Sequence, residues 1–271
     1  MDTYWKLNLL EEMVVKPVKA KLFELEIPFN EAFTHSTKAR VASDAIVMKI
    51  EADDGSVGYG EGLPRPYVTG ESVDFVLDHI PKVLWPKLKE HTFTEIGSHS
   101  DLAQFDSAMG EAKASDTIAP NAARCACEVA LIDCALRSQN QSLSDIFPPR
   151  TDQVQYSGVI PANSPEKAAK HAKKMTMLGL GHLKIKIAIG DDLARIQSVV
   201  DAVGEGEPIR LDANAAWDLN TAIEQIPSLE QFNIEAIEAP IKRTTIADLV
   251  AYKAKTSMPI SVDEYLVTPE D

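Results

Sequence analysis

The segments HLKIKI at residues 182–187 and PIRLDAN at residues 208–214 decide the fold of this chain. In both segments apolar residues alternate with charged or polar ones, which is the period of a β-strand. The isoleucines of the first segment would face a covering layer, and Lys184 and Lys186 would then point to the opposite side. Strands of parallel sheets are usually apolar throughout, so these charges indicate a site rather than a plain core.

Further strand and helix patterns alternate around these two segments. We expect strands at 154–160, 182–187, 208–214, 233–239 and 259–263, with helices between them. This alternation predicts a parallel sheet, and short strands at regular spacing predict a barrel. The expected fold class is therefore α/β, with the first five strands of a TIM-type β/α barrel over residues 151–271.

Residues 1–150 follow another pattern and are expected to form an α+β capping domain. Strands are expected at 18–26, 45–51 and 56–60, and an alanine-rich helix at 122–137. A linker with two prolines, Pro148 and Pro149, marks the domain boundary near 150. Residues 27–40 are expected to be a long loop between the first two strands, and loops of this length are often functional.

An ionisable side chain recurs at the C-terminal ends of the expected barrel strands. The positions are Lys186, Asp212, Glu238 and Asp263, separated by 26, 26 and 25 residues. Active sites of β/α barrels lie at this end. Converging carboxylates repel one another unless a cation lies among them, and an all-oxygen set suits a hard ion such as Mg²⁺. Each carboxylate alone could be a turn or capping residue, but their common period favours a metal site.

The two lysines at 184 and 186 supply the other half of the expected chemistry. Like-charge repulsion between them and from a divalent ion would favour the neutral amine, which is the form that acts as a base. A carbon acid next to a carboxylate is very weak, so a metal ion must stabilise the enediolate that forms. We therefore expect abstraction of the proton α to a substrate carboxylate. The alternative for the lysines, a solvated edge strand, conflicts with a strand that is second of five.

These residues resemble the enolase superfamily, in the muconate-lactonizing-enzyme subgroup of the mandelate racemase/muconate lactonizing enzyme family. The matching motifs are GYGE at 58–61, VTGE at 68–71, KIK at 184–186, LDAN at 211–214, IEAP at 237–240 and DE at 263–264. The resemblance implies the following roles: Mg²⁺ ligands Asp212, Glu238 and Asp263, base Lys186, and electrostatic neighbour Lys184. It also implies that loop 27–40 closes over the site and reads the substrate, with Phe33, His35 and Asn214 as candidate substrate-binding residues.

The resemblance implies an enzyme, a Mg²⁺-dependent racemase or epimerase of dipeptides or N-acylamino acids. Two alternatives stay open. A muconate-type cycloisomerase or an o-succinylbenzoate synthase-like dehydratase can work with Lys186 as the only base, and a non-catalytic remnant would bind a ligand without turnover. The second base of the family is a lysine on a sixth strand, so we expect the native polypeptide to be about 90 residues longer than this sequence.

Composition limits the partners and the location. The 27 Lys and Arg residues against 41 Asp and Glu residues give a formal net charge of −14, which disfavours a nucleic acid partner. No apolar run reaches the roughly 20 residues of a membrane span, and we expect neither a membrane partner nor a secretory signal. The expected partners are a small carboxylate substrate and further copies of the chain in a homo-oligomer.

The cysteines and the glycine-rich run are minor signals. Cys125, Cys127 and Cys134 share one helical stretch and are expected to be reduced core thiols of a cytoplasmic protein. The run GYGEG at 58–62 gives only a weak indication of dinucleotide binding, because no helix opens on it.

Overall fold

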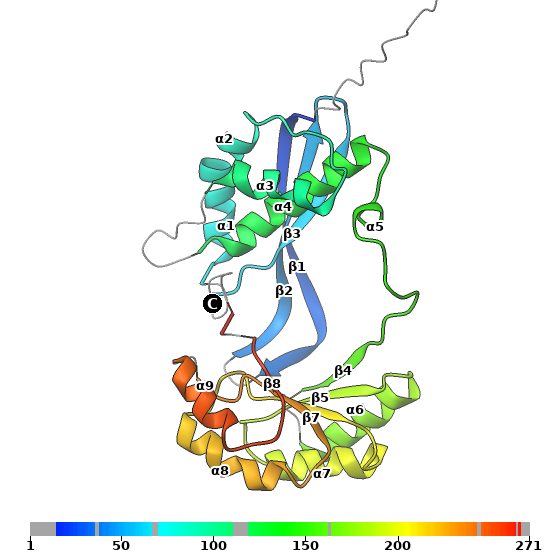
Figure 1. Ribbon diagram of the computed structural model, residues 1–271, viewed down its shortest axis with the longest axis vertical. Coiled ribbons are helices and arrows are strands. Elements are labelled where there is room, and N and C mark those ends of the chain that lie inside the picture. Colours follow the sequence, from blue (N-terminus) through cyan, green and yellow to red (C-terminus); the bar gives the residue numbers. More distant parts are fainter. Residues whose placement is uncertain are drawn as a thin grey trace, which may run out of the picture. The chain divides into compact units, whose positions relative to one another are not determined.

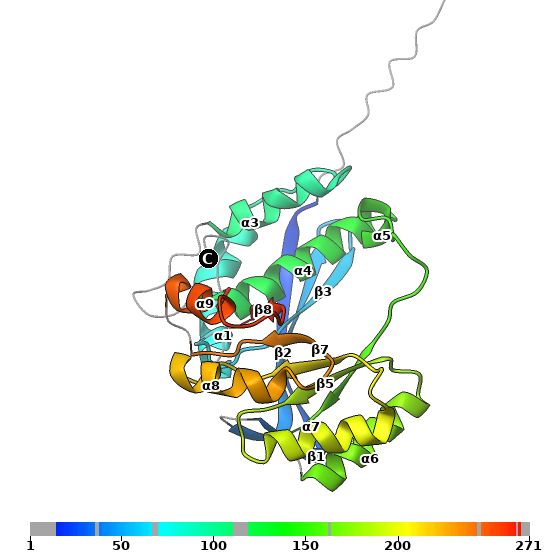
Figure 2. The ribbon, with the colours of Figure 1, turned by 60° about the horizontal axis from the view of Figure 1, so that its bottom comes forward.

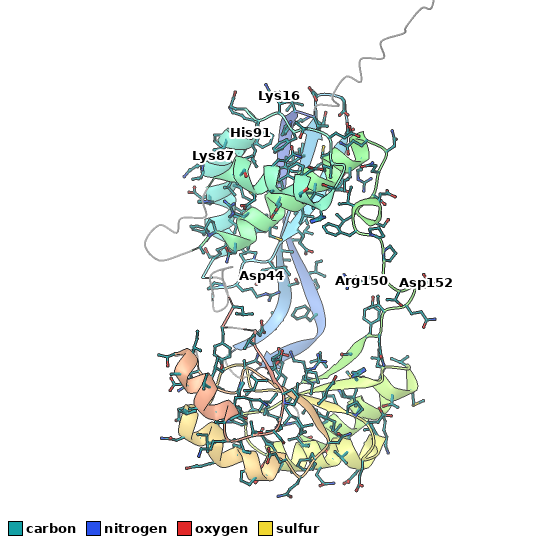
Figure 3. All side chains as sticks on the ribbon, viewed as in Figure 1. Lys16, Asp44, Lys87, His91, Arg150 and Asp152 are labelled. Carbon is teal, nitrogen blue, oxygen red and sulfur yellow. The ribbon has the colours of Figure 1, made fainter. Side chains whose placement is uncertain are left out.

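The computed structural model describes residues 15–35, 38–66, 70–110, 119–161, 164–242, 245–263 and 265–266, with residues 30–35 and 38–40 described by their backbone alone. The chain divides into two compact units. Unit 1 comprises Met1–Pro28 and Ala42–Arg150, and unit 2 comprises Phe29–Val41 and Thr151–Asp271. Arg150 and Asp152, labelled in Figure 3, flank the point where the chain passes from unit 1 to unit 2.

Unit 1 contains most of a three-stranded sheet in the order β1-β2-β3, and the end of β1 and the start of β2 belong to unit 2. The strands are β1 (Pro17–His35), β2 (Lys38–Ala52) and β3 (Val57–Gly62). β2 and β3 pair antiparallel, from Ile46 opposite Gly62 to Glu51 opposite Val57. The turn between them contains Gly55 at φ 86°, a left-handed conformation that glycine adopts without strain.

The expected loop at 27–40 is wrong as a description of the backbone. β1 continues to His35 and β2 begins at Lys38, so most of this stretch is strand. Pro28 is a turn signal in the sequence, but β1 lies at the edge of the sheet, where proline is tolerated within a strand. The division into units also differs from a single boundary near 150, because Phe29–Val41 groups with unit 2.

Helices cover the sheet of unit 1 and complete its core. They are α1 (Val73–His79), the π-helical turn η1 (Ile80–Leu84), α2 (Trp85–Leu88), the 3₁₀ turn η2 (His99–Leu102), α3 (Ala103–Met109), α4 (Asn121–Ser138) and α5 (Leu143–Ile146). The buried carboxylate of Glu71 accepts the backbone N–H groups of Ala122 and Ala123 at 2.6 and 3.0 Å, which caps the first turn of α4.

The glycines of β3 allow α4 to pack directly on the strand (Figure 2). A Cβ added at Gly58, Gly60 or Gly62 would lie 2.2 to 2.3 Å from a backbone carbonyl oxygen of α4. The structure therefore explains the GYGEG run by helix–strand packing, without a dinucleotide. On the same helix Cys127 and Cys134 are buried, whereas Cys125 is exposed, so the expectation of a core thiol is wrong for Cys125.

Unit 2 alternates strands and helices, and its five strands form one sheet in the order β4-β5-β6-β7-β8, with every pair parallel (Figure 1). The elements are β4 (Ser157–Ile160), α6 (Pro165–Met177), β5 (His182–Lys186), α7 (Asp192–Val203), β6 (Ile209–Asp212), α8 (Leu219–Leu229), β7 (Ile234–Glu238), α9 (Ile246–Lys253) and β8 (Ile260–Ser261). This order confirms the expected α/β class, with an antiparallel cap and a five-stranded parallel sheet.

The helices of unit 2 pack on one face of its sheet. Ile185, Leu211 and Ile237 are fully buried and belong to one apolar cluster with Ala168, Val199 and Ile226 from the helices. The alternation of each strand therefore directs Lys184, Lys186 and Asp212 to the other face, as the sequence predicts. We call this second face the inner face. None of the helices in the described part of the chain combines the length and the apolar composition that a bilayer span requires.

Candidate active site

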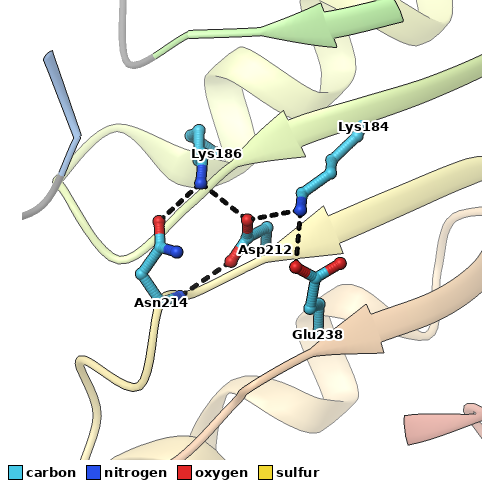
Figure 4. Close-up of polar contacts among 5 residues, drawn as sticks. All are labelled: Lys184, Lys186, Asp212, Asn214 and Glu238. Carbon is cyan, nitrogen blue, oxygen red and sulfur yellow. Dashed lines mark hydrogen bonds and ion pairs between the residues drawn. The ribbon is translucent and has the colours of Figure 1, made fainter. Parts of the chain in front are cut away.

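The inner face carries a compact cluster of charged side chains on three neighbouring strands (Figure 4). The register pairs Lys184 with Arg210, Lys186 with Asp212, and Asp212 with Glu238. Lys186, Asp212 and Glu238 therefore lie at one level, at the C-terminal ends of β5, β6 and β7. Ligand sites of parallel α/β proteins are found at this end of the strands.

Asp212 is the centre of the cluster. Its side chain is 1% exposed. Its Oδ2 accepts hydrogen bonds from the ammonium groups of Lys184, at 2.8 Å, and Lys186, at 2.6 Å. Its Oδ1 accepts the backbone N–H of Asn214 at 2.9 Å. Burial alone would raise the pKa of this carboxyl group, but the hydrogen bonds from the two lysines hold the pKa below its ordinary value. The carboxylate is therefore ionised at neutral pH.

Lys184 joins two carboxylates. Its Nζ lies 2.8 Å from Asp212 Oδ2 and 2.5 Å from Glu238 Oε1. Burial alone would lower the pKa of Lys184, but its hydrogen bonds to Asp212 and Glu238 raise that pKa above the ordinary value. The like-charge repulsion expected between the lysines is thus outweighed at Lys184, and this residue stays protonated.

Lys186 has two partners in the cluster. Its Nζ donates to Asp212 Oδ2 at 2.6 Å and to Asn214 Oδ1 at 2.7 Å. Asn214 lies two residues after the end of β6 and has a left-handed φ of 46°. The structure therefore places Asn214 next to both Asp212 and Lys186.

Asp263 does not join this cluster. It is exposed in a bend after β8, and in the described ranges no group of three His, Cys, Asp or Glu side chains could hold a metal ion. The register explains the difference, because the residue opposite Glu238 is Ser261, and Asp263 follows two positions later. The regular spacing of Asp212, Glu238 and Asp263 in the sequence therefore did not place Asp263 at the same register level as the other two.

Two other predicted site residues cannot be placed. Phe33 and His35 lie in β1, but their side chains are outside the described part of the structure. Their proposed contact with a substrate stays a prediction.

Arg195 is a supporting residue that the sequence did not indicate. It is 4% exposed on α7, and its guanidinium donates to Asp192 Oδ1 at 2.8 Å, to the carbonyl of Gly190 at 2.6 Å and to the carbonyl of Lys186 at 3.4 Å. These bonds fix the turn that leaves β5. The only available signal was an arginine on the apolar face of the helix, beside Ile196 and Val199.

Strained backbone follows each of the three site strands. Ala188 after β5, Asn214 after β6 and Ala239 after β7 all have positive φ, at 65°, 46° and 40°. Non-glycine residues in this region cost on the order of 1–3 kcal/mol each and concentrate at functional sites. The strain thus supports a functional role for this end of the sheet.

Comparisons with known proteins agree with this geometry. Residues 167–271 match the family model described as "Enolase C-terminal domain-like". The chain is 28% identical over 261 residues to L-Ala-D/L-Glu epimerase of Bacillus subtilis, which covers 94% of this chain and 68% of that protein. The structure of a substrate-liganded complex of that epimerase has a TM-score of 0.81 at 27% identity, over 94% of this chain and 70% of that one.

Two further relatives widen the comparison. The crystal structure of the Enterococcus faecalis dipeptide epimerase complexed with Mg and the dipeptide L-Leu-L-Tyr has a TM-score of 0.79 at 27% identity, over 93% of this chain and 68% of that one. N-succinyl-L-Arg/Lys racemase of Bacillus cereus is 28% identical over 251 residues, which cover 90% of this chain and 65% of that protein. The chain thus spans about two thirds of the length of these relatives. Residues 167–271, which carry the motifs on β5, β6 and β7, thus match the enolase C-terminal domain-like family, and the chain is similar to dipeptide epimerases and to an amino acid racemase.

Proposed function

We propose that this site abstracts the proton α to a substrate carboxylate and that the protein is an epimerase or racemase of dipeptides or N-acylamino acids. The observation that carries the proposal is the cluster of Lys184, Lys186, Asp212 and Glu238 at one end of the parallel sheet. The epimerases and the racemase among the relatives support the same class of reaction.

The two carboxylates of the cluster fit a Mg²⁺ ion. In the structure the Lys184 ammonium lies between Asp212 Oδ2 and Glu238 Oε1, so this pair of oxygens already accepts a shared cation. Mg²⁺ in proteins is often held by one or two carboxylates together with water. Asp212 and Glu238 would hold the ion, and Asp263 as a third ligand is a further part of the proposal. A bound Mg²⁺ supplies positive charge that stabilises an enediolate.

The charges of the cluster suit an anionic substrate. Two ammonium groups against the three proposed carboxylate ligands leave a charge of −1, so a divalent cation would bring the local charge to about +1 in spite of the acidic chain. A substrate carboxylate is attracted to this charge. The Nζ of Lys186, which Asn214 Oδ1 and Asp212 Oδ2 orient, would then take the proton from the neighbouring carbon once it is a neutral amine.

A panel of candidate substrates tests the proposed function. The intact native protein with Mg²⁺ is incubated separately with L,L-dipeptides, N-succinyl-L-amino acids and cis,cis-muconate, and the products are separated by chiral chromatography. We expect a second stereoisomer from a dipeptide or an N-succinylamino acid, and we expect chelation of Mg²⁺ to stop its formation.

The other outcomes decide between the alternatives. Formation of a lactone from muconate, without epimerisation of the other compounds, would replace the proposal with a cycloisomerase. No conversion of any compound by a chain that binds Mg²⁺ would favour a non-catalytic binding protein.

A further inference from the structure

β7 contains one residue more than β6 over the stretch in which they pair. The backbone N–H of Ile209 donates to the carbonyl of Asn233 at 3.1 Å, and the N–H of Ala213 donates to the carbonyl of Glu238 at 3.1 Å. Four residues of β6 therefore correspond to five residues of β7. The register assigns the extra position to Glu235, because Ile209 pairs with Ile234 and Arg210 pairs with Ala236. This is a β-bulge.

The bulge determines which way Glu238 points. Before it, Ile209 and Ile234 both pack toward the helices, and residues that pair in a parallel sheet share a face. With strict alternation from Ile234, Glu238 would also point into the apolar helix layer. The extra residue reverses the alternation, so Ile237 is buried beside the helices and Glu238 pairs with Asp212 on the inner face.

The side chain of the extra residue contacts the neighbouring strand β6 and, beyond it, β5. Glu235 Oε2 lies 3.2 Å from His182 Nδ1 on β5 and 3.6 Å from Arg210 Nη2 on β6. All three side chains are about one third exposed. His182 begins β5 and Lys186 ends it, about 13 Å away at the usual rise per residue, so Glu235 is too far from the site to touch a substrate there.

We infer that Glu235 is a positioning residue for the active site. Its carboxylate ties the bulge of β7 to His182 and Arg210, and thereby holds Glu238 at the level of Asp212 and Lys186. This inference depends on the proposed function in one respect, because the proposed function makes Glu238 a Mg²⁺ ligand. Residues that support metal ligands in this indirect way commonly change metal affinity by about 10- to 100-fold when they are replaced.

Mg²⁺ titration calorimetry on the full chain tests the inference. The variants are Glu235→Ala and Glu235→Gln, with Glu224→Ala, an exposed carboxylate on α8, as the matched control. We expect Glu235→Ala to weaken Mg²⁺ binding at least tenfold, Glu235→Gln to retain part of the affinity, and the control to stay within twofold of wild type. A Glu235→Ala protein with a lower Tm and an unchanged Mg²⁺ affinity would show a merely structural role and overturn the inference.

Amide hydrogen exchange gives a second readout that needs neither metal nor activity. The N–H of Ala213 bonds across the bulged pair to Glu238, so its exchange should accelerate at least tenfold in Glu235→Ala and not in Glu224→Ala. If wild type binds no Mg²⁺, the proposed function fails, and unchanged exchange at Ala213 would independently overturn the role of Glu235. If Glu235→Ala does not fold, Arg210→Gln removes the same ion pair and is measured in its place.

Discussion

At the scale of single residues, the site depends on one buried carboxylate with two cationic partners. Asp212 is 1% exposed and accepts hydrogen bonds from Lys184 and Lys186. A buried charge is tolerated only when it is paired. Removing its partners lowers the free energy of unfolding by more than the pair itself contributes to it. The same groups that would carry the chemistry are therefore groups that stabilise unit 2.

The low pKa of Asp212 predicts a specific pH dependence of stability. Burial would raise this pKa, but the lysine hydrogen bonds lower it below that of an unfolded aspartate, about 3.9. The carboxylate therefore stabilises the fold above about pH 4, and this contribution is lost as the pH falls through the folded-state pKa. We expect Asp212→Asn to reduce the free energy of unfolding by about 2 kcal/mol at pH 7, and by progressively less below pH 4.

Urea unfolding at pH 7 and at pH 3 measures this difference. Asp152→Asn, at an exposed position, is the control and should change stability little at either pH. A difference between wild type and Asp212→Asn that stays the same at both pH values would contradict the assigned cause.

The thiols of α4 give a second prediction at the residue scale. Burial raises the pKa of Cys127 to about 12 and that of Cys134 to about 11, so both are neutral thiols at pH 8. Cys125 is exposed. In native protein we expect iodoacetamide to modify Cys125 well before the other two, as seen by peptide mass spectrometry. Rapid labelling of Cys127 or Cys134 without unfolding would contradict this order, and Cys125→Ser serves as the control.

At the scale of elements, the packing of α4 on β3 follows from matched repeats. Two residues along a strand cover about 6.6 Å and four residues along a helix about 6.0 Å. Gly58, Gly60 and Gly62 consequently meet the carbonyls of Ala130, Ala126 and Ala122 in turn, and the helix runs opposite to the strand. Glycine is required here because the helix backbone occupies the space of a Cβ.

A methyl group at the middle glycine should separate these elements. A Cβ at Gly60 would lie 2.2 Å from the carbonyl oxygen of Ala126 and 2.4 Å from the N of Ala130. Backbone atoms cannot move away as a flexible side chain can, so we expect Gly60→Ala to destabilise the protein by about 3 kcal/mol in urea unfolding. Gly97→Ala is the control, because its Cβ would have only Asp101 Oδ2 nearby, at 3.8 Å. Equal stability of the two variants would contradict the packing argument.

At the scale of the whole molecule, the sequence predicted the order and the faces of the elements but not their register. Alternation in HLKIKI placed Lys184 and Lys186 correctly on the inner face, because a strand buried on one side constrains its period. Alternation could not reveal the bulge at Glu235 or the height of Asp263, since both depend on hydrogen bonds between strands. The strand character of 27–35 was also hidden, because Pro28 is a turn signal that an edge strand tolerates.

Exchange of the substrate α-proton with solvent deuterium tests the central claim most directly, namely that Lys186 is the base in a Mg²⁺-dependent site on the inner face. Wild type with Mg²⁺ should incorporate deuterium at the α-carbon of an epimerisable dipeptide or N-acylamino acid, as followed by NMR. Lys186→Ala should abolish this incorporation, whereas Lys173→Ala, at an exposed position on α6, should leave it unchanged. Undiminished exchange in Lys186→Ala would remove Lys186 as the base and contradict the account.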